Sequence, residues 1–119
     1  MSYVDGFLIP LPKKNVKMYR RMAQLGKKTW MKNGALDYKE CLADDLTNPM
    51  GVSLLQLLKC KPDETVIFAY IVFKSRKHRD LVNKKVMSDP AMNDPHMMKQ
   101  MPFDMKRVCY GGFKTIVEL

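Results

Sequence analysis

Residues 62–73, PDETVIFAYIVF, decide the fold of this chain. In an extended backbone both sides of this stretch are apolar: one face carries Val66, Phe68, Tyr70 and Val72, and the other carries Ile67, Ala69, Ile71 and Phe73. A strand with one wet face alternates apolar with polar residues, whereas a strand covered on both sides is apolar throughout. The stretch therefore predicts a strand inside a sheet whose two faces are both covered.

The chain before this strand predicts a strand, a helix and a second strand. YVDGFLIPLP (3–12) is β-prone and ends at prolines, which cannot donate a hydrogen bond to a neighbouring strand. Residues 13–33 have helical spacing and stop at Gly34, a residue suited to the turn after a helix. The inward stripe of this helix comprises Val16, Tyr19, Met22, Ala23, Gly26 and Trp30. ALDYKECLA (35–43) predicts the second strand.

Two further helices are predicted by their caps. The turn-prone TNPMG (47–51) precedes a short helix over residues 54–59, for which Ser53 is the cap. After the central strand, Ser75 begins a helix that runs to about Met87. The residues expected to face inward from this helix are Leu81, Val82 and Val86.

The last part of the chain predicts a loop and a fourth strand. Residues 90–104 contain three prolines and no periodicity, which predicts a long loop, and KRVCYGGFKTIV (106–117) predicts the strand. The order of elements indicates an α+β fold of the ferredoxin-like βαββαβ type, in which a four-stranded antiparallel sheet carries two helices on one face. We expect residues 1–119 to form this single domain.

In this topology the first and last strands lie side by side. The segments DGF (5–7) and GGF (111–113) are then brought together, and facing glycines permit a bulge or a close approach of the two backbones. Sheet curvature without any ligand is the alternative interpretation of these glycines.

The second face of the sheet also needs a cover, because two helices protect only one face. An exposed apolar face of four strands would be larger than soluble monomers tolerate. A second copy of the chain, packed sheet against sheet, is the simplest cover. We therefore predict a homodimer through the sheet face.

Composition points to a soluble protein of the cytoplasm. The chain of 119 residues is 46% hydrophobic and 28% charged, and it contains no apolar run long enough to cross a bilayer and no signal-peptide pattern. Its cysteines, Cys41, Cys60 and Cys109, are widely separated and form no CxxC pair. This spacing disfavours disulfides and zinc and predicts reduced, mostly buried thiols.

Several segments together resemble one known family. They are YVDGF, GAL..KEC, ADD, DETVIF, RD, KKVMSDPAM and above all MPFDMKRVCYGGF. These segments resemble the YbaA-like family of uncharacterised bacterial proteins over essentially the whole chain. The resemblance implies a dimeric α+β barrel and no established activity. Two departures are Leu42, where the family tends to have an aromatic residue, and the more basic SRKHRD (75–80).

Positive charge concentrates on the first helix. The net charge of the chain is +9, and eight basic residues fall on one face of this helix: Lys13, Lys14, Lys17, Arg20, Arg21, Lys27, Lys28 and Lys32. Such a face suits a polyanion such as RNA or DNA, although no known nucleic-acid motif accompanies it, and a solvated surface is the alternative. A smaller anion site is predicted at the start of the later helix, where Ser75, Arg76 and Lys77 meet free backbone N–H groups.

The main functional hypothesis is a small polar or anionic ligand bound in a cleft. This cleft would lie between the sheet, the first helix and a Met-rich lid. Its expected lining is Tyr38, Glu40, Phe103, Asp104, Arg107 and Tyr110. Whether a reaction follows binding stays open; if one does, a carboxylate base would act with Arg107 holding an oxyanion.

Neither a cofactor nor a metal is predicted. No Ser/His/Asp, GxGxxG or Walker motif is present, and the two histidines, His78 and His96, lack metal-ligand spacing. Two alternatives to the ligand-binding hypothesis remain: a non-catalytic binder of RNA or DNA, and a structural or interaction protein without a pocket.

Overall fold

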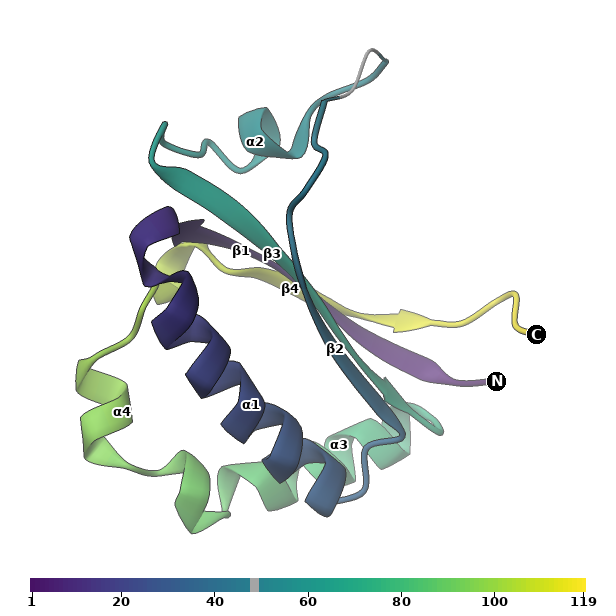
Figure 1. Cartoon of the computed structure of the whole chain (residues 1–119). Helices are drawn as coiled ribbons and strands as arrows, with labels where there is room; N and C mark the ends of the chain where they lie inside the picture. Colours follow the sequence, from purple (N-terminus) through teal and green to yellow (C-terminus); the bar gives the residue numbers. More distant parts are fainter. Residues whose placement is uncertain (48–49) are drawn as a thin grey trace.

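The computed structural model describes residues 1–47 and 50–119 and has an α+β architecture (Figure 1). Four antiparallel strands form the sheet: β1 (Tyr3–Pro12), β2 (Asp37–Leu42), β3 (Glu64–Phe73) and β4 (Cys109–Lys114). Their order across the sheet is β2-β3-β1-β4. The stretch that decides the fold is thus an inner strand, paired with β1 on one side and β2 on the other.

The first and last strands lie side by side, as predicted. Asp5 is opposite Gly112 and Gly6 is opposite Gly111 in the antiparallel register. A Cβ on Gly112 would lie only 2.8 Å from Cε2 of Tyr3 and 2.9 Å from an Arg79 nitrogen. The glycine therefore makes room for two side chains from other elements.

Prolines lie where β1 has a single neighbour. Pairing with β4 ends at Leu8, whereas pairing with β3 continues through Pro10 to Pro12. Strand prolines are tolerated where the missing N–H would face no partner. The strand therefore continues past Pro10 to the position at which β3 begins.

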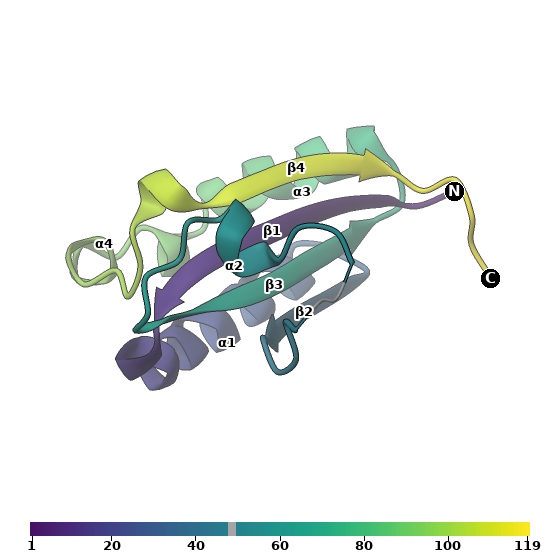
Figure 2. The same cartoon turned by 90° about the horizontal axis from the view of Figure 1, so that it is seen from above.

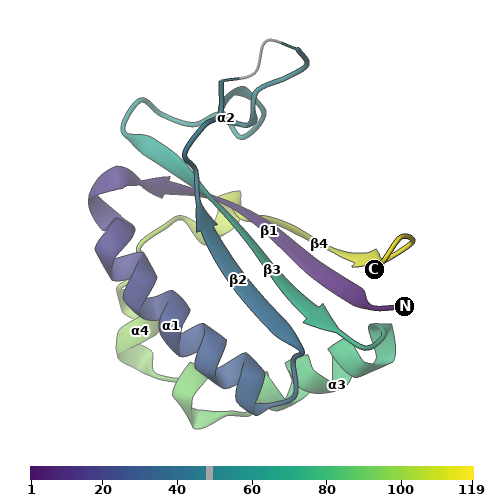
Figure 3. The same cartoon turned by 45° about the vertical axis from the view of Figure 1, so that its right-hand side comes forward.

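Two helices cover one face of the sheet (Figures 1 and 3). A 3-10 turn, η1 (Lys13–Asn15), leads into α1 (Val16–Lys32), and α3 (Arg76–Met87) follows β3. The side chains most deeply buried are Phe73, Leu11, Val66, Val82 and Val86. The prediction for Leu81 was wrong, because this side chain is 51% exposed. The predictions for Val82 and Val86, four residues apart on α3, are confirmed, since both side chains are buried against the sheet.

Both predicted serine caps are present. The Ser53 side chain accepts a hydrogen bond from the Gln56 N–H at the start of α2 (Leu54–Leu57), and that of Ser75 accepts one from the His78 N–H. At the other end of α1, Gly34 has a φ of 115°. That left-handed conformation is readily adopted by glycine, so the predicted helix stop is confirmed.

The segment predicted as a long loop contains short helices. It forms η2 (Pro90–Met92) and α4 (Pro95–Lys99), and η3 (Met105–Arg107) follows it, so β4 begins three residues later than predicted. In each case an aspartate side chain accepts a backbone N–H two residues onward: Asp89, Asp94 and Asp104. Two of these aspartates precede a proline, which is suited to the first helical position. In elements this short, the capping residue and not the apolar period is the feature of the sequence that indicates a helix.

The other face of the sheet is partly open. Figure 2 shows α2 above the sheet on this side, across β1 and β3. Beyond α2 the face carries Phe68, 49% exposed, and Phe113, 61% exposed. In the strand register these two side chains lie on the same face as Val4 and Leu8. We refer to this surface as the open sheet face.

The cysteine prediction was wrong in part. Cys41 and Cys109 are exposed on the outer strands β2 and β4, and only Cys60 is half-buried. Burial raises the pKa of the Cys60 thiol. Among the described residues, no helix has the length and apolar character required to cross a membrane.

Candidate functional site

Glu40 is the centre of a polar cluster beneath α1. The Tyr19 hydroxyl donates to Oε1 of Glu40 at 2.5 Å, and the Tyr38 hydroxyl donates to Oε2 at 2.6 Å. The edge of the Phe103 ring contacts Tyr19, with ring centroids 5.7 Å apart. Three of the six predicted lining residues, Tyr38, Glu40 and Phe103, therefore gather around Tyr19.

Burial keeps both tyrosines of this cluster protonated. The pKa of each phenol, Tyr19 and Tyr38, is raised far above its usual value, first by desolvation and then by the adjacent Glu40. Each phenol therefore stays a donor, and each Glu40 oxygen already has a partner. The cluster joins β2 to α1 through both oxygens of Glu40.

The cluster depends on a glycine in α1. A Cβ on Gly26 would lie 2.8 Å from the Tyr38 hydroxyl oxygen. No sequence pattern pairs Tyr19 with Glu40, because the contact depends on the position at which α1 crosses β2. The available signal in the sequence was Gly26, a small residue within the apolar stripe of the helix, because a glycine there marks a close approach of another group to the backbone.

Arg107 lies in a different setting from the one predicted. Its Nη1 donates to Oε2 of Glu64 at 2.6 Å, and Nη2 donates to the carbonyl of Lys59 at 3.1 Å and to that of Leu58 at 3.3 Å. This hydrogen bond from Arg107 lowers the pKa of Glu64. The guanidinium therefore fastens the segment after α2 to the start of β3.

The remaining predicted lining residues are at the surface. The Asp104 side chain is exposed and caps η3 through the Lys106 N–H. Tyr110 is 76% exposed and stacks on Phe7 with ring centroids 5.9 Å apart. Neither residue hydrogen bonds to the Glu40 cluster in the described part of the chain.

The predicted anion site at the start of α3 is exposed. Ser75, Arg76 and Lys77 are all at the surface, and Ser75 uses its hydroxyl oxygen to cap the helix. Deeper along α3, Arg79 donates to Oδ1 of the buried Asp5 at 2.6 Å and lies over the ring of Tyr3, 4.9 Å from its centroid. The Arg79 guanidinium is thus committed to an internal ion pair beside Gly112.

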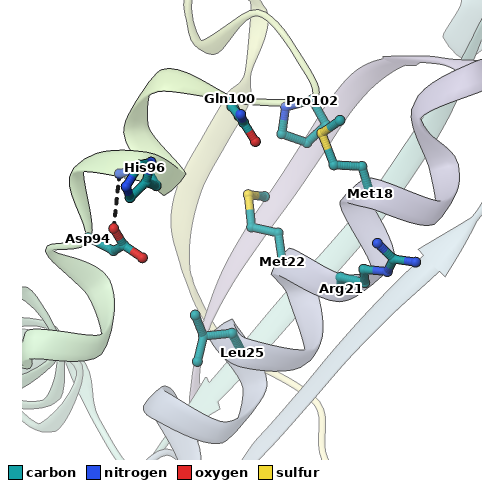
Figure 4. Close-up of a pocket in the computed structure, with 8 residues that line it drawn as sticks. All are labelled: Met18, Arg21, Met22, Leu25, Asp94, His96, Gln100 and Pro102. Atoms are coloured by element: carbon teal, nitrogen blue, oxygen red, sulfur yellow. Dashed lines mark hydrogen bonds between the residues drawn. The ribbon is translucent and has the colours of Figure 1, made fainter.

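A pocket of about 300 Å³ opens between α1 and residues 94–102 (Figure 4). We call it the α1–α4 pocket. From α1 it is lined by Met18, Arg21, Met22 and Leu25, and from the opposite side by Asp94, His96, Gln100 and Pro102. Figure 4 shows Met22 and Leu25 projecting from the helix and Asp94 and His96 across from them. None of the six predicted lining residues contributes to it.

A second, shallower hollow of about 540 Å³ lies where the ends of α1 and α3 meet. It is bordered by three lysines, Lys32, Lys84 and Lys85, and by the buried carboxylate of Asp89. Asp89 accepts from Lys32 at 3.3 Å and from Asn33 at 3.2 Å, and it caps η2. Lysines near the C-terminus of a helix are stabilised by the partial negative charge of its last carbonyl groups. The lysines and the aspartate around this hollow are therefore explained by the meeting of two helix ends.

The basic face of α1 exists as predicted. All eight of the predicted lysines and arginines are exposed, six of them in α1 and two, Lys13 and Lys14, in η1. Lys32 pairs with Asp89, and in the described part of the chain the other seven side chains form no ion pair. These seven cations are therefore available to an anionic partner.

Buried polar groups in the described residues are satisfied internally. Every buried side-chain nitrogen or oxygen there has a hydrogen-bond partner. In the same residues no group of three or more histidine, cysteine or acidic side chains has the geometry for a metal ion. A ligand would thus be recognised at the surface of a pocket and not by an orphaned buried group.

Comparisons with known proteins agree on the family. A family model described as a protein of unknown function (DUF1428) matches residues 2–105. The uncharacterized protein YbaA of Escherichia coli strain K12 is 37% identical over 118 residues, covering 99% of each chain, and YbaA of Shigella flexneri has the same identity and coverage. A solved de novo designed protein, Foldit4, matches with a TM-score of 0.50 at 6% identity, covering 97% of this chain and 99% of its own, a likeness of fold alone. The chain thus belongs to the DUF1428 family of proteins of unknown function and is similar to YbaA over nearly its whole length.

Proposed function

We propose that the protein is a homodimer that binds a small anionic molecule in the α1–α4 pocket of each subunit. The observation that carries this proposal is Arg21, an exposed guanidinium without an ion-pair partner in the described residues, at the edge of a pocket of about 300 Å³. Small-molecule sites combine an apolar lining with a few polar groups and begin at about this volume. Arg21 supplies the charged group and α1 the apolar lining.

The other polar clusters support this choice by exclusion. Glu40 has a tyrosine hydroxyl on each oxygen, and Arg107 is occupied by Glu64 and two carbonyls. A ligand at either place would first have to break internal hydrogen bonds to a charged group, each worth roughly 1.5–3 kcal/mol. Binding at Arg21 breaks no such contact.

The test compares two neighbouring arginines. Inorganic phosphate, acetate and benzoate are titrated into ¹⁵N-labelled protein, and amide shifts of residues around the pocket are followed by NMR. Arg21→Ala is expected to abolish the shifts, whereas Arg20→Ala, which removes the same charge outside the pocket, should retain them. Equal titrations in the two variants, or no saturable shift in the wild type, would refute the proposal.

The homodimer is proposed to form through the open sheet face. The strand order β2-β3-β1-β4 with two helices on one side fits a ferredoxin-like sandwich, and two such sheets packed face to face make a dimeric α+β barrel. Phe68 and Phe113 would be covered in that arrangement. We take residues 1–119 as one domain, and its three free thiols fit a reducing compartment such as the cytoplasm.

A second candidate function is polyanion binding by η1 and α1, favoured by their seven exposed cations without an ion pair in the described residues. Reversing the charges of Lys17, Arg20, Lys27 and Lys28 to glutamate would remove binding of labelled single-stranded RNA in fluorescence anisotropy. Wild-type affinity would fall steeply with salt, because released counterions drive such binding. Absence of binding by the wild type at low salt, or wild-type affinity in the fourfold variant, would exclude this candidate.

A further inference from the structure

We infer that the ligand of the α1–α4 pocket is an amphipathic monocarboxylate, that is, a short-chain or aryl carboxylate with a single negative charge. This inference rests on the proposed function and adds the chemical class of the ligand. It follows from the apolar floor of the pocket, from the one unpaired cation at its edge and from the carboxylate opposite.

The floor of the pocket suits an apolar body. Met18, Met22 and Leu25 come from successive turns of α1, and the buried Pro102 closes one end. Unbranched thioethers adapt their shape and contact aromatic rings favourably. An inorganic anion would leave this apolar surface unused.

The positive charge suits a carboxylate. Arg21 lines the pocket at the edge of α1, between Met18 and Met22 in the sequence, and Figure 4 shows its side chain directed away from Asp94 and His96. A guanidinium presents parallel N–H groups that match the two oxygens of a carboxylate. With the carboxylate at Arg21, an attached chain or ring lies over the methionines.

The opposite side disfavours a second negative charge. Asp94 uses Oδ1 to accept the His96 backbone N–H at 2.9 Å, and this contact holds its carboxylate at the pocket wall. A like charge placed near it is repelled, whereas a hydroxyl or a neutral group is not. Dicarboxylates and phosphate therefore fit less well than a monocarboxylate.

The two walls are held together before any ligand arrives. The Asn15 side chain donates to the Pro102 carbonyl at 2.8 Å, which fastens the end of the 94–102 segment to the start of α1. Next to it, Phe103 packs against the buried Tyr19. When a ligand binds to a preformed pocket, little free energy is lost to ordering the side chains and backbone of the protein.

The experiment titrates phenylacetate, hexanoate, succinate, inorganic phosphate and benzyl alcohol into the full chain by NMR and calorimetry. We expect phenylacetate and hexanoate to bind at least roughly tenfold more tightly than succinate, phosphate or benzyl alcohol, because each of these lacks the apolar body, the single charge or the carboxylate. Arg21→Ala should weaken phenylacetate binding by roughly tenfold or more, and Arg20→Ala should leave it unchanged.

A further variant tests the selectivity directly. Asp94→Asn keeps a side chain that caps α4 but removes the negative charge. It is expected to raise the affinity for succinate relative to phenylacetate, and an unchanged ratio would overturn the role of Asp94.

The outcomes separate this inference from the proposed function. Arg21-dependent binding in which succinate or phosphate equals or exceeds phenylacetate overturns the ligand class and leaves the pocket in place. Absence of Arg21-dependent binding by every probe at millimolar concentration overturns both.

Discussion

Gly111 and Gly112 are adjacent in β4 but differ in how closely other side chains approach the position of a Cβ atom. A Cβ on Gly112 would be forced against Tyr3 and Arg79, whereas one on Gly111 would lie 3.7 Å from the Phe113 ring, an ordinary contact. The sequence indicated that these glycines meet β1. It did not indicate which side chains use the space, because Arg79 comes from a helix that the pattern of β4 does not describe.

We predict opposite outcomes for alanine at these two positions. Gly112→Ala should lower the free energy of unfolding by about 1–3 kcal/mol, because the new methyl group overpacks the Tyr3 and Arg79 contacts. Gly111→Ala should change it by less than about 1 kcal/mol in either direction. Urea unfolding followed by fluorescence measures both, and an equal loss in the two variants would contradict the assignment of Gly112 as the close contact.

The buried phenols predict an alkaline limit of stability. Tyr19 and Tyr38 have raised pKa values when folded, so above about pH 10 the unfolded chain releases protons that the folded chain retains. Their contribution to stability is complete below that pH and is lost as the pH rises. The free energy of unfolding should fall by up to roughly 1.4 kcal/mol per pH unit for each tyrosine.

Urea unfolding at a series of pH values above 10 measures this slope. The double variant Tyr19→Phe/Tyr38→Phe should have a shallower slope than the wild type, whatever its stability at neutral pH. Tyr110→Phe, at an exposed tyrosine, is the control and should keep the wild-type slope. Identical slopes in the double variant and the wild type would show that these phenols are not protected.

At the scale of elements, the start of α3 gives a direct test of capping. Ser75→Ala should destabilise the protein by about 1 kcal/mol, since it removes the acceptor of the His78 N–H. Hydrogen exchange at the His78 amide should become faster. Ser75→Asn, which retains a capping oxygen, should behave like the wild type, and an unaltered exchange rate in the alanine variant would exclude the cap.

Elements with strong periodicity were predictable, whereas of the short helices only α2 was, through its Ser53 cap. The inner strand β3 and the long helix α1 follow from their apolar patterns, with ends set by Gly34 and by neighbouring strands. The helix α4 has five residues, too few for a period, and its only signal is the Asp94-Pro95 pair. Since one wall of the α1–α4 pocket is built from this element, the pocket itself could not be predicted from the sequence.

At the scale of the whole molecule, the open sheet face predicts the assembly. Phe68 and Leu81 are almost equally exposed, at 49% and 51%, but lie on opposite sides of the molecule, one on the open sheet face and one on α3. Light scattering should report a dimer for the wild type and for Leu81→Asp, and a monomer for Phe68→Asp, because a buried unpaired charge opposes association. A monomeric wild type, or a dimeric Phe68→Asp, would contradict the assembly.

The sequence predicted that this face of the sheet needs a cover. It did not predict that α2 covers part of the face within the same chain. The insertion between β2 and β3 returns over the sheet and brings α2 against β3, where Val66 is 2% exposed. Residues 48 and 49 of the predicted TNPMG turn lie outside the described part of the chain. The path of such an insertion depends on long-range contacts like that of Arg107 with the Lys59 carbonyl, which leave no local pattern.

The two exposed cysteines can report, through their reactivity, on whether the surface of the sheet is free or covered. Cys41 is paired in register with Phe68 and Cys109 with Leu8, so one thiol lies on each outer strand of the same surface. An alkylating reagent such as iodoacetamide would modify both quickly on a free surface and slowly on a closed one, while Cys60 reports on local opening of the segment after α2. Mass spectrometry of alkylation over time, repeated across protein concentrations, would thus follow association without any added label.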